Sequence, residues 1–222
     1  MKIDQIIHSK RRTIALIVDR DGRLIVRAPL RASQKQILLF VEQKRDWIRS
    51  KQELASSMYA RFLPKKYANG ENFLFLGKTY RLVIVEKSDS PLRLADQFIL
   101  TRAASARGEK VFKGWYAAQA RKVIPERVKI YAVTHGFNFL RVNITSAQTR
   151  WGSCSPSGSL NFSWRLVMAP MQVIDYVVIH ELVHLRQKNH SRHFWDEVKT
   201  MMPDYAQQVK WLKTNGHMLR LT

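Results

Sequence analysis

The hydrophobic positions at the start of the chain follow the pattern of paired β-strands. Residues 13–18 are rich in β-branched side chains, and a second apolar run covers residues 24–26. The Asp-Gly pair at 21–22 lies between the two runs and is typical of a tight turn. The pattern therefore predicts a hairpin that ends at Pro29.

A helix and a second hairpin are expected next. Ser33 stands three residues before Gln36, which is the arrangement of a capping box, and apolar residues then recur at helical spacing. We expect this helix to run to about Leu54. Further on, the runs 73–76 and 80–85 again have the composition of two paired strands.

The middle of the chain contains a gap in this periodicity. Residues 98–100 predict a short strand, whereas residues 103–110 are small and polar without a repeating pattern, so we expect a linker there. From Val111 a helical pattern runs toward Gly136, a suitable C-cap. Pro125 lies inside this helix and predicts either a kink or a split into two helices.

The predicted linker divides the chain into two regions with an α+β fold. Residues 1–107 form an N-terminal region of hairpins and helix, which we expect to pack on a C-terminal domain, residues 108–222. In the latter, residues 142–144 and 160–166 predict strands of a small sheet, with a Gly/Ser-rich loop at 151–159 between them.

A long apolar run after Pro170 leads into the pattern H-E-x-x-H at residues 180–184. On a helix, residues four apart differ by about 40° in azimuth and ~6 Å in rise. The imidazoles of His180 and His184 therefore lean to one side and can share a metal ion. Glu181 is rotated by ~100° from His180, so its carboxylate reaches a metal-bound water and takes its proton. This pattern predicts a metal-dependent hydrolase.

A catalytic zinc ion usually takes three protein ligands. His190 lies six residues after His184, which is the spacing of the extended metzincin pattern, except that Gln187 replaces the glycine. His193 is an alternative that would lie one turn into the following helix, and Glu197 is a weaker oxygen-ligand candidate. We favour His190 as the third ligand.

The composition limits the kinds of partner and the cellular location that we expect for the protein. The formal net charge of +21 indicates contact with a polyanion such as nucleic acid or a nucleotide, although a solvated basic surface is the alternative. Cys154 is the single cysteine, which excludes an intramolecular disulfide. No stretch approaches the ~20 apolar residues of a membrane span, and the N-terminus has no apolar signal core. We expect a cytoplasmic protein with no membrane partner.

The chain resembles the YgjP-type metal-dependent hydrolases, which are bacterial relatives of the SprT and WLM metalloproteases. The resemblance extends from about residue 11 to residue 212 and is carried by several blocks: residues 180–184, 189–195, 203–205, 150–155, 164–166 and 27–29. It implies a zincin-like C-terminal domain with one Zn²⁺ per chain, held by His180, His184 and His190, with Glu181 as the general base. Ser163 departs from the family pattern, which often has Asn there.

Two further residues are candidates for substrate binding. Arg165 could stabilise an oxyanion or bind a carboxylate or phosphate, and a structural ion pair is the alternative. Tyr205 could donate a hydrogen bond in the transition state, with packing at a helix end as the alternative. We also expect residues 160–165 to form a strand edge along which an extended peptide pairs.

Three functions are compatible with these residues. The favoured one is a zinc metallopeptidase that cleaves a peptide or protein substrate, with Glu181 deprotonating water and then protonating the leaving amine. The second is a metal-dependent phosphoanhydride hydrolase acting on nucleoside triphosphates. The third is a metalloprotease recruited to nucleic acid through the basic surface.

Overall fold

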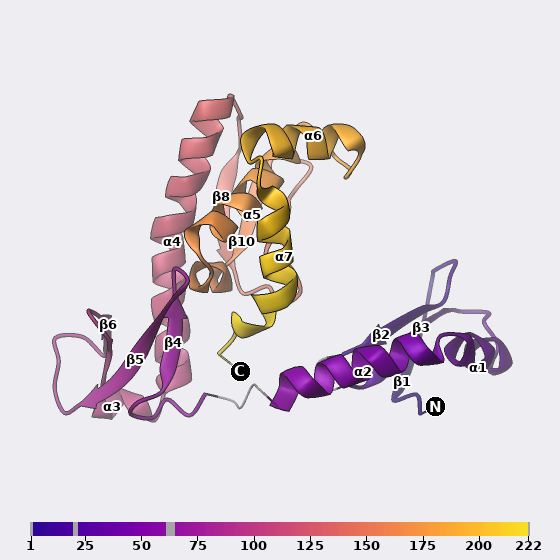
Figure 1. Ribbon diagram of the computed structural model, residues 1–222, viewed down its shortest axis with the longest axis horizontal. Coiled ribbons are helices and arrows are strands. Elements are labelled where there is room, and N and C mark those ends of the chain that lie inside the picture. The colour runs from indigo at the N-terminus through magenta and orange to yellow at the C-terminus, as the bar shows by residue number, and fades with distance from the viewer. Residues whose placement is uncertain (1, 20–21, 61–64, 222) are drawn as a thin grey trace. The chain divides into compact units, whose positions relative to one another are not determined.

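A computed structural model describes residues 2–19, 22–60 and 65–221. The chain forms two compact units, Met1–Leu63 and Pro64–Thr222 (Figure 1). The Asp21 half of the predicted Asp-Gly turn lies outside the described residues, while Gly22 has the positive φ of 76° that such a turn needs.

The first unit is a small sheet covered by two helices. Its three-stranded sheet has the order β1-β3-β2. The bounds are β1 Gln5–Ser9, β2 Ala15–Val18, β3 Leu24–Pro29, α1 Gln34–Gln43 and α2 Arg45–Ala60. The predicted hairpin is confirmed, since β2 and β3 pair antiparallel, whereas β1 was not predicted and pairs parallel to β3.

The capping box is also confirmed, but the single helix predicted after it is wrong. The Ser33 side chain accepts from the Gln36 backbone N–H, and the Gln36 side chain accepts from the Ser33 N–H. The helix ends at Gln43, because its C-cap Lys44 has a ψ of 16°, which departs from helical values, and a new helix begins at Arg45. The break keeps Ile37 and Ile48 in one buried cluster against β3.

The second unit begins with a four-stranded sheet of order β4-β5-β7-β6. Its strands are β4 Asn72–Phe75, β5 Lys78–Val85, β6 Leu92–Leu94 and β7 Phe98–Thr101. The second predicted hairpin is confirmed, and its turn places Leu76 and Gly77 at φ values of 47° and 77°. The strand expected at 98–100 is β7, while β6 was not predicted.

The linker predicted at 103–110 is wrong, because helix α3 (Arg102–Ser105) and the start of α4 (Gly108–His135) occupy it. Helix α4 is continuous through Pro125, which therefore does not split it. Gly136, at φ 67°, ends the helix as expected.

The boundary expected at residue 107 is replaced by the one after Leu63, because the sheet of β4 to β7 shares its core with α4. The Phe73 and Phe112 rings stack with centroids 4.1 Å apart. The Tyr116 hydroxyl donates to the Leu74 carbonyl at 2.6 Å. These contacts join the middle of the chain to the C-terminal part in one hydrophobic core.

A second, three-stranded sheet of order β8-β10-β9 lies beside α4 and α5 (Figure 1). The remaining elements are β8 Arg141–Thr145, β9 Gly152–Cys154, β10 Ser159–Ser163, η1 Trp164–Met168, α5 Met171–Val183, α6 Arg192–Met201, α7 Tyr205–Asn215 and η2 Gly216–Met218. Both strands predicted in this region are present, although the second ends at Ser163 and continues as the 3-10 helix η1.

Helix α5 is buried along almost its whole length. Its one buried acidic residue outside the H-E-x-x-H pattern, Asp175, accepts two hydrogen bonds from the Arg127 guanidinium of α4, at 2.6 and 2.8 Å. None of the helices in the described ranges is both long enough and apolar enough to cross a membrane.

The β4–β5 turn offers a test of the fold. A Cβ at Gly77 would lie 2.9 Å from the Pro170 Cα, and its φ is positive, so Gly77→Ala should destabilise the protein by about 1–3 kcal/mol. A Cβ at Gly114, within α4, would meet no described atom within 4 Å, so Gly114→Ala should stabilise the protein by about 0.5–1 kcal/mol. Denaturant unfolding measures the free energy of unfolding of both variants. Equal changes in the two variants would contradict the close contact between Gly77 and Pro170.

Candidate metal centre

The helix α5 carries the H-E-x-x-H pattern to its C-terminus. His180 lies in its last turn, and His184 is its C-cap with φ −61° and ψ −17°, so the backbone stays helical across the pattern as predicted. The two imidazoles meet edge to face, with ring centroids 4.9 Å apart and an interplanar angle of 82°. The first two histidines are thus side by side because of helical spacing alone.

The third histidine arrives from the turn that follows α5. The Asn189 side chain accepts from the Ser191 N–H at 3.2 Å and turns the chain into α6. His190, within this turn, brings its Nε2 to 3.1 Å from the Nε2 of His180. One ring nitrogen from each of His180, His184 and His190 lies within 4.8 Å of the others.

The ring of Phe194, in α6, packs against all three imidazoles. Its side chain is fully buried, and its ring centroid lies 4.9, 4.7 and 4.7 Å from the centroids of the three imidazoles. Sequence reasoning did not identify this residue as part of the site. Its position within the first turn of an amphipathic helix predicts only a core residue, so its contact with the histidines needed the structure.

The protonation of the histidines suits metal binding. The His184 Nδ1 lies 2.9 Å from the Gln187 carbonyl, which can only accept, so Nδ1 carries the proton and Nε2 has the lone pair. Burial, together with the nearby His184 and His190, lowers the pKa of His180 to about 3. Burial also lowers the pKa of His184. The rings of His180 and His184 are therefore neutral near pH 7.

The donor set fits a divalent metal such as zinc. Nitrogen ligands at ~2.0–2.1 Å from a tetrahedral ion lie about 3.4 Å apart, close to the 3.1 Å between the Nε2 atoms of His180 and His190. The alternatives named from the sequence lie elsewhere. His193 is exposed on α6 and outside the histidine group. Glu197 pairs with Arg186 at 2.8 Å.

Glu181 is buried against the edge strand β9. The residue is 5% exposed, and a Cβ on Gly152 would lie 2.6 Å from its Oε1. Burial raises the pKa of Glu181 to about 8, and the positive charge of Arg150 opposes that rise. Gly152 is therefore required because any larger residue would occupy the space of the carboxylate, a role that the sequence alone did not reveal.

Arg165 lies beneath the loop that precedes β9. Its Nη1 donates to the carbonyls of Ser146 and Ala147 at 3.1 and 3.3 Å, and its guanidinium lies 4.4 Å from the Trp164 ring centroid. The side chain is buried. These contacts support the structural alternative for Arg165, with backbone carbonyls as its partners, and a role in substrate binding stays a prediction.

Tyr205, at the start of α7, belongs to the aromatic group beside the histidines. Its ring stacks on Trp195 at 5.5 Å and on Tyr176 at 6.4 Å. The Tyr176 hydroxyl lies 3.4 Å from the His180 Nδ1. This placement is compatible with packing, and a hydrogen bond from Tyr205 in the transition state stays a prediction.

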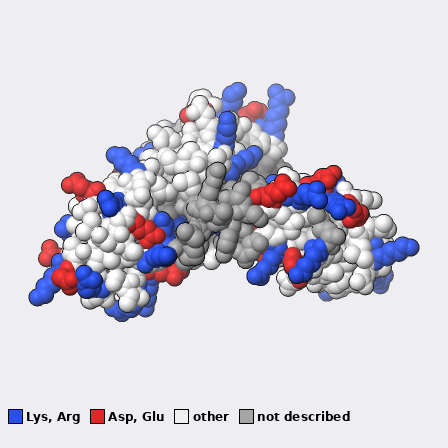
Figure 2. Space-filling view, turned by 60° about the horizontal axis from the view of Figure 1, so that its bottom comes forward, with Lys and Arg blue, Asp and Glu red and all other residues white. Residues whose placement is uncertain are grey.

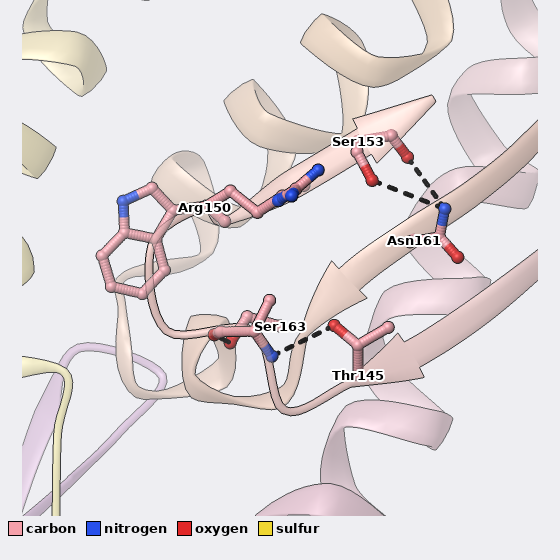
Figure 3. A pocket seen from close by; sticks show the side chains of 8 residues that line it. Thr145, Arg150, Ser153, Asn161 and Ser163 are labelled. Atoms are coloured by element: carbon pink, nitrogen blue, oxygen red, sulfur yellow. Dashed lines mark hydrogen bonds between the residues drawn. The ribbon is translucent and has the colours of Figure 1, made fainter. Parts of the chain in front are cut away.

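The strand edge beside α5 differs from the expected one. Residues 160–165 were predicted as the edge, but β10 is the central strand, between β8 and β9. The edge nearest the helix is β9, which lay inside the predicted loop. Next to it is a pocket of about 210 Å³ whose lining includes Arg150, Ser153 and Asn161 (Figure 3).

Two solved structures resemble part of the chain: the metallopeptidase zymogen abylysin of Pyrococcus abyssi and the metallopeptidase zymogen jannalysin of Methanocaldococcus jannaschii. Abylysin is 20% identical, with a TM-score of 0.39 over 41% of this chain and 93% of its own. Jannalysin is 18% identical, with a TM-score of 0.38 over 42% of this chain and 95% of its own.

A comparison with curated proteins gave no match. The model of the YgjP-like metallopeptidase domain matches residues 12–215, which include most of both units and all three histidines of the site. The chain therefore belongs to the YgjP-like metallopeptidase family.

Proposed function

We propose that this protein is a zinc metallopeptidase in which His180, His184 and His190 hold the metal and Glu181 is the general base. The observation that carries the proposal is the convergence of three ring nitrogens next to a buried carboxylate. Membership of a metallopeptidase family makes the chain a metal-dependent hydrolase. The identity of the metal and the roles of the four residues are the parts that we propose.

The proposed mechanism assigns a separate task to each group. The bound metal supplies Lewis-acid activation of water and of the scissile carbonyl. Glu181 accepts a proton from the attacking water and returns it to the leaving amine. Because Glu181 is buried between α5 and β9, its carboxylate is held in one position and its affinity for a proton is high.

The proposed substrate is an extended segment of a peptide or protein. The strand β9 pairs with β10 on one side and leaves its other edge for a further strand. A peptide that adds to this edge would donate and accept backbone hydrogen bonds along Gly152–Cys154, beside the Glu181 carboxylate. The edge strand thus supports a peptide substrate over a compact small molecule.

The two other functions considered from the sequence remain predictions. Lys and Arg side chains are spread over the face in Figure 2 with Asp and Glu among them, which is compatible with a solvated basic surface as well as with a polyanion partner. Nucleoside triphosphates and DNA therefore belong in the same activity screen as denatured protein and peptides. A cytoplasmic location also remains a prediction.

Glu181→Gln tests the general base. We expect the variant to bind zinc like the wild type but to lose about 10²–10⁴-fold in peptide hydrolysis, because the amide cannot take the proton. Glu197→Gln, which removes a carboxylate paired with Arg186, should keep wild-type turnover. Undiminished turnover in Glu181→Gln would reject this residue as the base.

The third ligand is tested by elemental analysis of dialysed protein. His190→Ala should lower the zinc content markedly, since it removes one of the three convergent nitrogens. His193→Ala should retain the zinc of the wild type, because His193 is exposed and outside the group. Equal zinc content in the two variants would overturn the assignment of His190.

Gly152→Ala tests the packing of β9 on Glu181. The added methyl group displaces the carboxylate, and a shift of about 1 Å is expected to reduce kcat about 10²-fold while zinc content is unchanged. Gly114→Ala serves as the matched control, since its surroundings are open. A Gly152→Ala enzyme with wild-type kcat would show that the carboxylate has room to spare.

A further inference from the structure

The sheet β8-β10-β9 has one face that is polar along its central strand, β10. On β10, Leu160 and Phe162 point into the core and are fully buried, so Asn161 and Ser163 point to the opposite face. Their partners across the sheet, Asn143, Thr145 and Ser153, share this face through the strand register. Amide and hydroxyl groups therefore cover the sheet where the pocket opens.

Hydrogen bonds fix the positions of these polar side chains. The Asn143 amide donates to the Asn161 Oδ1 at 3.0 Å. The Asn161 amide donates to the Ser153 Oγ at 3.4 Å, as Figure 3 shows. Ser163 Oγ donates to the Ala147 carbonyl at 2.9 Å. In the part of the chain that the structure describes, the Ser153 hydroxyl accepts and its proton remains available to a ligand.

Arg150 is an exposed residue that lines this pocket, and it differs from the other arginines near the site. The guanidinium groups of Arg165 and Arg186 are held by carbonyls or a carboxylate. Among the described residues, the Arg150 guanidinium has no hydrogen-bond partner, and its charge acts on the Glu181 carboxylate. Figure 3 shows the Arg150 side chain extending along β9 toward Ser153. Five N–H donors are thus presented to an incoming group.

The pocket and the proposed base lie on the two faces of β9. The Cβ position of Gly152 faces Glu181, whereas Ser153 and Asn161 point to the opposite face, where the pocket is. A peptide paired with the β9 edge alternates its side chains between these faces, so a side chain next to the scissile bond reaches the pocket. A guanidinium beside a hydroxyl donor matches the two oxygens of a carboxylate. The pocket lining contains one cation, which balances a single negative charge, so a carboxylate fits it better than a phosphate dianion.

We propose that Arg150, with Ser153 and Asn161, forms a subsite that binds a carboxylate of the peptide substrate close to the scissile bond. This inference rests on the proposed peptidase function and adds a substrate preference to it. The carboxylate comes either from an Asp or Glu side chain or from the C-terminus of the peptide. Arg150 acts as a specificity-determining residue, because it selects the substrate, while Glu181 is the group that exchanges protons with it.

Peptide binding tests the subsite without any hydrolysis. Fluorescence anisotropy is measured with metal-free protein in a chelator, so that a carboxylate cannot bind through the metal. One labelled peptide carries an internal Glu and an amidated C-terminus, a second carries Gln and a free C-terminus, and a third carries Gln and an amidated C-terminus. We expect one of the first two to bind about tenfold more tightly than the third.

Charge reversal separates a subsite from the general basic charge. Arg150→Glu should abolish the preference for the carboxylate peptide and favour a matching peptide with Lys. Arg141→Glu makes the same charge change on an exposed residue at the start of β8 and should preserve the preference. Wild-type protein without a preference, or an equal loss in both variants, would overturn the proposal.

Hydrolysis of the same peptides by the zinc-loaded protein distinguishes the two proposals. Arg150→Glu should raise KM for the carboxylate peptide about tenfold relative to KM for the neutral peptide, whereas the loss of the Arg150 charge beside Glu181 should change kcat for both peptides by the same factor. A wild-type enzyme that cleaves all three peptides at equal kcat/KM contradicts the subsite but supports the peptidase. If no peptide is cleaved, the peptidase proposal fails, and the binding preference alone decides whether the carboxylate subsite exists.

Discussion

The close approach of β9 to α5 is the constraint on which the site depends. A carboxylate buried to this extent normally loses more solvation than its surroundings return, and the raised pKa of Glu181 reflects that cost. The glycine at 152 allows the strand backbone to cover the acid without displacing it. The same strand ends the sheet, so the backbone that covers the Glu181 carboxylate also forms a sheet edge.

The histidines depend on a different kind of support. Imidazoles this close together repel one another when charged, and burial keeps His180 and His184 neutral. Phe194 fills the space beneath all three rings, so each ring has an apolar contact that fixes it before any ion is bound. A preformed group of this kind loses little conformational entropy when it takes up a metal.

The sequence predicted the parts of the site that follow from local geometry. The pairing of His180 with His184 is a consequence of helical spacing, and the short turn to His190 leaves that residue little freedom to lie elsewhere. Helix α3 and the break at Lys44 were missed for local reasons as well. Only Ala104 of α3 is buried, so the α3 sequence shows no periodicity, and no Gly or Pro marks the break at Lys44.

The parts of the site that could not be predicted from the sequence are those that require pairing between distant segments. A three-residue strand such as β9 has too few positions to show alternation, and its place at the sheet edge is set by its register with β10.

The ion pair between Arg127 and Asp175 has a consequence for the direction in which α5 points His180 and Glu181. A helix that is apolar on nearly every side has no preferred rotation about its own axis, because each orientation buries a similar area. One ionic contact to α4 removes that freedom, since any other rotation would leave an unpaired charge in the core. The orientation of His180 and His184 about the helix axis is thereby set by Asp175, a buried residue more than one turn upstream on the same helix.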